Sequence, residues 1–220
     1  MDFQEIDEDY EERMLQFEID CNDGKGNPMA CQSAGEYFSV VKNDLKKAAK
    51  IYAENCSRHN FPPSCFNLGR IILSGRIENM QDTAQAKTSF ETACEGKHTQ
   101  ACYHLALMLL HGIGDTKKDI PKAHQLLDDA CKESDPQSCY LLANQLLKTT
   151  VENRDPARAK SLLEVSCDRG HAPSCFNLAV MYKNGDTGVP SNQEKFKEYK
   201  NITEVLVKQA GGSLQGIKKA

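Results

Sequence analysis

The groups in this sequence best suited to chemistry are ten cysteines, which fall into five pairs along the chain. Nine residues separate the cysteines of the first pair, eight those of the second and seven those of the last three. The pairs are Cys21 with Cys31, Cys56 with Cys65, Cys94 with Cys102, Cys131 with Cys139, and Cys167 with Cys175. Cysteines in such pairs could form local disulfides, bind zinc or carry out thiol redox chemistry.

Local disulfides are the simplest interpretation of these spacings. A tetrahedral zinc site needs four ligands, usually with only two to four residues between paired cysteines. A thiol oxidoreductase needs an exposed cysteine of low pKa, and the sequence has no C-x-x-C motif. A helix end, a short turn and the next helix start can bring two Cα atoms to disulfide distance. We therefore expect five structural bridges, each worth about 2.5 kcal/mol, with zinc binding and redox activity as alternatives.

Apolar residues recur around each pair with the spacing of one helical face. The fourth residue before the first cysteine is Phe17, Tyr52, Phe90, Leu127 or Leu163. Apolar or small residues also stand three, four and seven positions after each second cysteine, which again indicates a helix. The second cysteines repeat after 34, 37, 37 and 36 residues, which is typical of solenoids built from helix pairs. The pattern predicts an all-α fold: a right-handed α-solenoid of five disulfide-stapled helix–turn–helix repeats.

The pattern also sets the expected boundaries. Residues 1–21 should form an N-terminal capping helix with a polar outer face, residues 22–210 one elongated repeat domain, and residues 211–220 a frayed tail. The five repeats are expected at about 30–57, 64–96, 101–133, 138–169 and 174–209. Prolines just upstream of the first helices should stop the chain from continuing as helix. Asp82, Asp119 and Asp155 are placed to begin second helices.

Short motifs resemble SEL-1-like repeats over nearly the whole chain. They are SCFNLG at Ser64–Gly69, SCFNLA at Ser174–Ala179, YKNG at Tyr182–Gly185 and GVP at Gly188–Pro190. With its five cysteine pairs, the chain resembles the mitochondrial cytochrome c oxidase assembly factor 7 family most closely. The resemblance implies a location in the mitochondrial intermembrane space, import by oxidative trapping of cysteines, and haem as a candidate cofactor.

Composition excludes some classes of partner. A net charge of −4 and a pI near 5.9 give no electrostatic reason to expect nucleic acid or an anionic membrane. The longest wholly apolar run, Leu105–Leu110, is far shorter than the roughly 20 residues of a membrane-spanning helix. The acidic segment 1–12 lacks the apolar core of a secretory signal. These features agree with an oxidised protein of the intermembrane space.

One polar cluster departs from the repeat pattern. His104, Met108 and His111 follow Cys102 on one helical face, which we predict to lie outside the core. Histidine and methionine can ligate haem iron, so these residues are candidate haem or metal ligands, with ordinary surface residues as the alternative. His98, four residues after a cysteine, should lie in a turn or a helix cap.

The concave face of a solenoid offers the other candidate site. Offsets two, five, six and nine after each second cysteine should face a client protein there. The candidate residues are Tyr37, Arg70, Ile71, Asn144, Met181 and Asn184, together with the histidine cluster.

No catalytic signature is present, so we predict a non-enzymatic scaffold. The resemblance implies an assembly factor for respiratory complex IV, with complex IV subunits or their assembly machinery as partners. Bacterial cysteine-rich SEL-1-like proteins suggest an alternative, penicillin binding or β-lactam hydrolysis, but the S-x-x-K, S-D-N and K-T-G set is absent. A thiol–disulfide oxidoreductase and a metal or haem chaperone are further alternatives.

Overall fold

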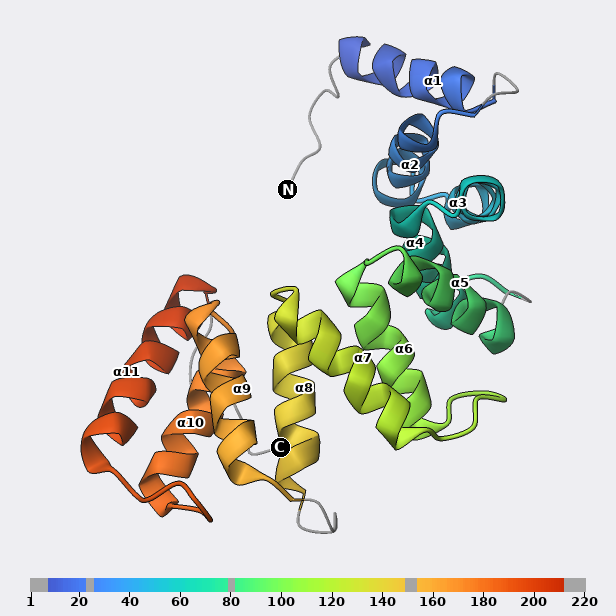
Figure 1. Ribbon diagram of the computed structural model, residues 1–220. Helices are drawn as coiled ribbons and strands as arrows, with labels where there is room; N and C mark the ends of the chain where they lie inside the picture. Colours follow the sequence, from blue (N-terminus) through green and yellow to red (C-terminus); the bar gives the residue numbers. More distant parts are fainter. Residues whose placement is uncertain (1–7, 23–25, 79–81, 149–153, 212–220) are drawn as a thin grey trace. The chain divides into compact units, whose positions relative to one another are not determined.

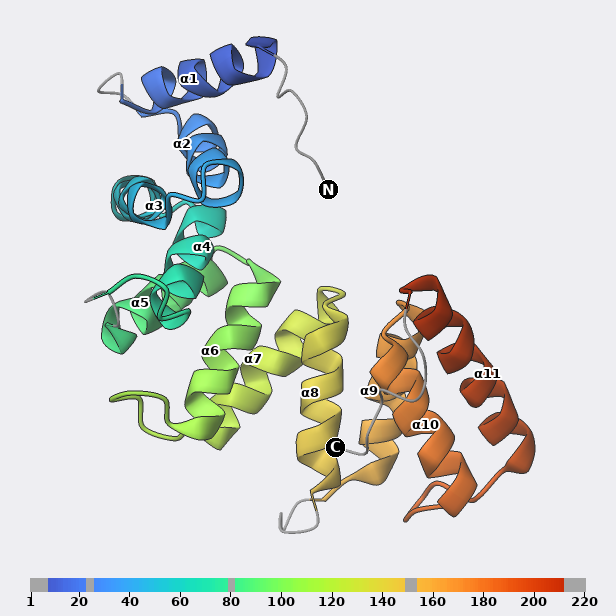
Figure 2. The same ribbon diagram turned by 180° about the vertical axis from the view of Figure 1, so that it is seen from behind.

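The computed structural model describes residues 8–22, 26–78, 82–148 and 154–211. The chain forms two compact units, residues 1–123 and residues 124–220. The described residues contain eleven α-helices and one π-helix, with no strand beyond an isolated bridge between Asp186 and Val189. The α-helices are labelled in Figure 1, and Figure 2 shows them from behind. The prediction of an all-α repeat fold is confirmed, and the single elongated domain stays a prediction.

The helices alternate as the repeat pattern predicts. The first helices of the five hairpins are α2 (Pro28–Glu36), α4 (Pro62–Leu73), α6 (Thr99–His111), α8 (Pro136–Leu147) and α10 (Ala172–Asn184). The second helices are α3 (Leu45–His59), α5 (Thr83–Glu95), α7 (Ile120–Lys132), α9 (Pro156–Asp168) and α11 (Gln193–Gln209). Within the second unit, α9, α10 and α11 pack side by side (Figures 1 and 2). Helix α7 contains the boundary between the units.

The first residues of the helices correct the expectation for the prolines and confirm the one for the aspartates. Three prolines expected upstream of first helices lie inside the first turn instead: Pro136 is the first residue of α8, and Pro63 and Pro173 are the second residues of α4 and α10. Proline is tolerated there because the first N–H of a helix has no intrahelical partner. The expected aspartate caps are present: Asp82 and Asp155, for example, accept backbone N–H groups at 2.9–3.0 Å.

The N-terminal helix, α1 (Glu8–Asn22), packs against α2. Its Phe17 contacts a buried cluster that includes Cys21 and Ala34. The polar outer face expected for this helix is wrong in part, because Leu15 and Ile19 are 54% and 60% exposed. Residues 1–7 of the predicted capping helix and the predicted tail from residue 212 lie outside the described residues.

Candidate functional site

All ten cysteines are bonded in the five expected pairs. Each bond joins the end of one helix to the first turn of the next hairpin, with Cα atoms 4.7–4.9 Å apart. One residue in each intervening turn has a left-handed conformation, which ends the helix and redirects the chain. These residues are Gly26, Asn60, Lys97, Ser134 and Gly170, with φ between 48° and 80°. Sequence reasoning missed this feature because four different residue types occupy the position.

The staples differ in accessibility. Nine of the ten cysteines are buried, and Cys94 alone is half-buried. Thiol–disulfide exchange and phosphine reduction need access to a sulfur atom. We therefore expect the Cys94–Cys102 bond to be reduced first when a phosphine reductant is titrated into the native protein. Alkylation and peptide mapping would check this order, and earlier labelling of another pair would contradict it.

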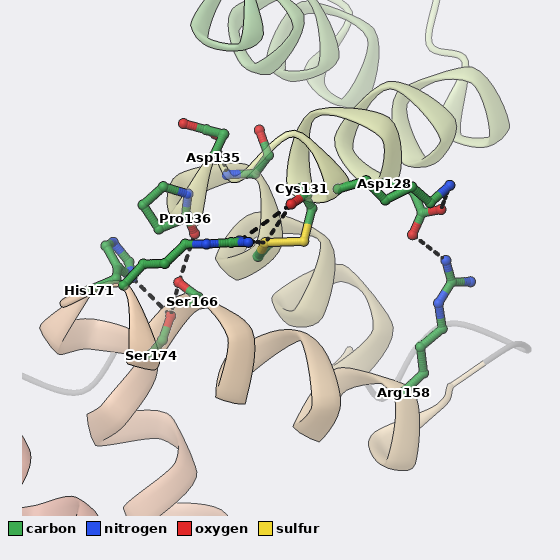
Figure 3. The surroundings of a disulfide bond; sticks show 12 residues. Asp128, Cys131, Asp135, Pro136, Arg158, Ser166, His171 and Ser174 are labelled. Atoms are coloured by element: carbon green, nitrogen blue, oxygen red, sulfur yellow. Dashed lines mark hydrogen bonds and ion pairs between the residues drawn. A yellow bond between two sulfur atoms is a disulfide. The ribbon is translucent and has the colours of Figure 1, made fainter.

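An arginine lies against the staple between α7 and α8, whose surroundings are drawn in Figure 3. Arg169 Nη1 donates to the Cys131 carbonyl at 3.4 Å and lies 3.9 Å from Cys139 Sγ. The second unit therefore links the end of α9 to the preceding staple by a polar contact as well as by apolar packing.

A buried chain of hydroxyl groups lies beside this staple (Figure 3). Ser174 Oγ donates to Ser166 Oγ at 2.7 Å, and Ser166 Oγ donates to the Pro136 carbonyl at 2.7 Å. Since the Ser174 proton is committed to Ser166, His171 Nδ1, at 2.8 Å, must donate to Ser174. A general base would instead accept the serine proton. With both serines 0% exposed, this arrangement pins α8 to α9 and α10 and does not present a nucleophile to a substrate.

The structure separates the predicted haem or metal residues. Met108 is 0% exposed and packs in the core, so its predicted place outside the core is wrong. His104 is half-buried and stacks on Phe90, with ring centroids 5.2 Å apart and planes 11° apart. His111 is exposed at the end of α6. Within the described residues no three His, Cys, Asp or Glu side chains come together as a metal site.

The predicted concave face needs the same correction. In an α-helix each residue advances by about 100°, so offset six lies only about 60° from the core column at offset three. Tyr37, Met108 and Met181 at offset six are accordingly 5%, 0% and 7% exposed. Offsets five and nine lie farther from the core, and Arg70 and Asn184 are exposed there. Other expected residues take different places: Ile71 is half-buried, and Asn144 accepts a hydrogen bond from Asn177 at 3.0 Å.

Half-buried histidines make stability depend on pH. Burial lowers the pKa of His98, His104, His124 and His171 below the ordinary histidine value. Below that ordinary value the unfolded chain binds more protons than the folded chain. Stability is therefore complete above about pH 6.5 and is lost as the pH falls through the folded-state pKa values.

We expect the free energy of unfolding to decrease as the pH falls from about 6.5 to about 5.5, a window above most carboxylate pKa values. The double variant His98→Asn/His104→Asn should show a shallower decrease, because asparagine does not titrate in this range. Asparagine can also cap α6 as His98 does, by accepting from the Ala101 N–H. Urea unfolding across this pH window would measure the slope. Equal slopes for wild type and variant would contradict the assignment.

The first unit contains a groove of about 650 Å³. It combines residues of α1, α2, the π-helix Tyr37–Val41, α3 and α4, together with Arg76. Three predicted client-binding residues, Tyr37, Arg70 and Ile71, line it together. Ser33, Glu36, Val40, Asn67 and Ser74 also line it and stand at the predicted offsets two, five or nine. The lining residues outside those offsets are Tyr10, Met14, Phe17, Ser39, Val41, Leu45, Tyr52 and Arg76. The helical stripe formed by Tyr10, Met14 and Phe17 was visible in the sequence, but nothing there indicated a groove.

These helical hairpins match known proteins in sequence and in structure. The Sel1 repeat family model matches residues 99–135, 136–171 and 172–195. A solved Sel1 repeat protein from Oxalobacter formigenes superposes with a TM-score of 0.74 at 17% identity, over 87% of this chain and 78% of its own. A protective antigen of uropathogenic Escherichia coli, described as displaying an SLR fold, gives 0.76 at 22% identity over 87% of this chain. This chain spans 41% of that antigen's length. Residues 99–195 of this chain therefore match Sel1 repeats, and its fold resembles that of solved Sel1-repeat proteins.

The individual proteins that this chain resembles in sequence carry a more specific name. Cytochrome c oxidase assembly factor 7 of Mus musculus is 27% identical over 87% of this chain and 71% of its own length. The Homo sapiens protein of that name is 28% identical over 88% of this chain and 71% of its own length. The protein thus resembles the cytochrome c oxidase assembly factor 7 family over most of its sequence.

Proposed function

We propose that this protein is a non-enzymatic assembly factor for cytochrome c oxidase that holds a protein client in the mitochondrial intermembrane space. The observation that carries the proposal is the complete local pairing of all ten cysteines in a chain that resembles cytochrome c oxidase assembly factor 7. Disulfides form and persist in oxidising compartments. The relatives' name supplies the assembly role.

Features of the site support binding in preference to catalysis. The groove of the first unit joins apolar and aromatic side chains with a few polar groups, as ligand-binding clefts do. In the second unit, Ser174 is buried, and its hydrogen bonds to Ser166 and His171 run opposite to those needed for base catalysis.

Among the described residues no helix is long and apolar enough to cross a membrane. The buried position of Met108 removes haem ligation by the His104 cluster from the proposal.

Loss of the protein in its native cells tests this role. We expect the amount of assembled cytochrome c oxidase on native gels to fall, and wild-type protein to restore it. Protease protection in isolated mitochondria and in mitochondria with a ruptured outer membrane would test the compartment. Mass measurement after acid quench and alkylation should find no free thiol. Normal cytochrome c oxidase in the absence of the protein would overturn the proposed function.

A further inference from the structure

The groove of the first unit has an irregular wall, formed by the single π-helix among the described residues. The π-helix Tyr37–Val41 is marked by a wide-turn hydrogen bond from Lys42 N to Tyr37 O at 3.1 Å. π-helical turns are rare and occur frequently at functional sites. Here the turn contributes Val40 and Val41 to the groove lining, and Val40 is 78% exposed. The wall therefore offers apolar side chains to a ligand.

The groove lining also carries two arginines, Arg70 and Arg76, with no carboxylate partner among the described residues. Arg70 lies over the Phe66 ring, 5.5 Å from its centroid, and Arg76 Nη2 donates to Asn43 Oδ1 at 3.3 Å. Within the described residues neither forms an ion pair, whereas Arg154 and Arg158 of the second unit each do. An arginine fork favours a carboxylate with two parallel hydrogen bonds.

The charge of the lining differs from that of the chain. The lining residues include two arginines and one acidic residue, Glu36, which accepts from Gln32 Nε2 at 2.7 Å. The chain as a whole carries a net charge of −4. A net positive lining in an acidic protein gives the groove a preference for anionic ligands over the rest of the surface.

We infer that the groove binds a short segment of a client protein in which an apolar side chain stands beside a carboxylate. The carboxylate pairs with Arg70 and Arg76, and the apolar side chain packs against Val40 and Val41. A volume of about 650 Å³ lies within the usual range of ligand clefts and accommodates a few residues. This inference rests on the proposed client-binding role and specifies the chemistry of the client segment.

Selection from a library of random short peptides tests the inference with the full-length oxidised protein. We expect the enriched peptides to contain Asp or Glu beside Leu, Ile, Val, Met or Phe. In fluorescence polarisation, a labelled enriched peptide should bind the double variant Arg70→Glu/Arg76→Glu at least about tenfold more weakly than wild type. Selection on that variant should replace the acidic residue by Lys or Arg. The control Arg58→Glu reverses an exposed charge on α3 outside the groove and should keep the acidic preference.

Several outcomes would overturn the inference. One is enrichment of no acidic–apolar peptide by the wild-type protein, and another is the same peptide motif after charge reversal. A third is a wild-type dimer in sedimentation that Arg70→Glu converts to a monomer, since a second copy would then occupy the groove. Thermal unfolding and intact mass establish that each variant is folded and fully oxidised.

The inference and the proposed function fail separately. A groove without selectivity overturns the inference and leaves the assembly role intact. Normal cytochrome c oxidase in cells that lack the protein overturns the assembly role and leaves the peptide preference intact.

Discussion

Complete reduction of the five disulfides is expected to unfold the protein at 37 °C. Each bond closes a loop of only eight to ten residues, and such a loop stabilises by about 2.5 kcal/mol through the entropy of the unfolded chain. Five staples together contribute about 12 kcal/mol. Domains of ordinary size have a net stability of about 5–15 kcal/mol, so little or none would remain.

The packing around the staples makes the loss harder to compensate. Four of the bonds join consecutive hairpins and the first joins α1 to the first hairpin, and in repeat arrays stability depends on the interfaces between neighbours. Cys65, Cys139 and Cys175 are 0% exposed, so their reduction leaves thiols in tightly packed surroundings.

Circular dichroism with and without a phosphine reductant would measure the helix content and the unfolding transition. The single-staple variant Cys56→Ala/Cys65→Ala should lose about 2.5 kcal/mol in urea unfolding while the other four bonds remain. Alanine is the appropriate replacement because a serine hydroxyl at Cys65 would be buried. An unchanged cooperative transition after full reduction would contradict the expected role of the staples.

The second large effect is expected where two helices of one hairpin approach closely. Gly69 in α4 faces Phe90 in α5, which is 0% exposed. A Cβ atom at Gly69 would lie 2.7 Å from Phe90 Cε1 and 2.9 Å from Cζ. These contacts are too short, so the buried Phe90 ring would have to shift within the core. The variant Gly69→Ala should therefore lose about 2 kcal/mol, although alanine is the better helix former.

The same chain suggests the compensating change. In the fourth repeat, Ala143 of α8 corresponds to Gly69. The residue there that corresponds to Phe90 is the smaller Leu163 of α9. The variant Phe90→Leu alone should lose about 1–3 kcal/mol, because it leaves space beside Gly69. The double variant Gly69→Ala/Phe90→Leu should lose less unfolding free energy than the two single variants lose in sum, by at least about 1 kcal/mol. Urea unfolding of the four proteins measures this coupling, and additive losses would show that the two positions are independent.

The repeat architecture could be predicted from the sequence because its signals are local. Helix periodicity, aspartate caps and the spacing of paired cysteines are properties of short segments, and they located ten repeat helices to within a few residues. The pairing of cysteines was predictable for the same reason, since a single turn joins the two members of each pair. The resemblance to Sel1 repeats rests on such short motifs as SCFNLG at Ser64–Gly69.

The tertiary structure decided which faces are free. Offset six lies at the edge of the core stripe of each helix, and packing decides its burial: Met108 and Met181 are 0% and 7% exposed, whereas Ile71 at the same offset is half-buried. The groove depends on a π-helix at Tyr37–Val41 and on the approach of α1, α2, α3 and α4. Burial and cleft formation depend on contacts between segments far apart in sequence, whereas periodicity describes only one helix at a time.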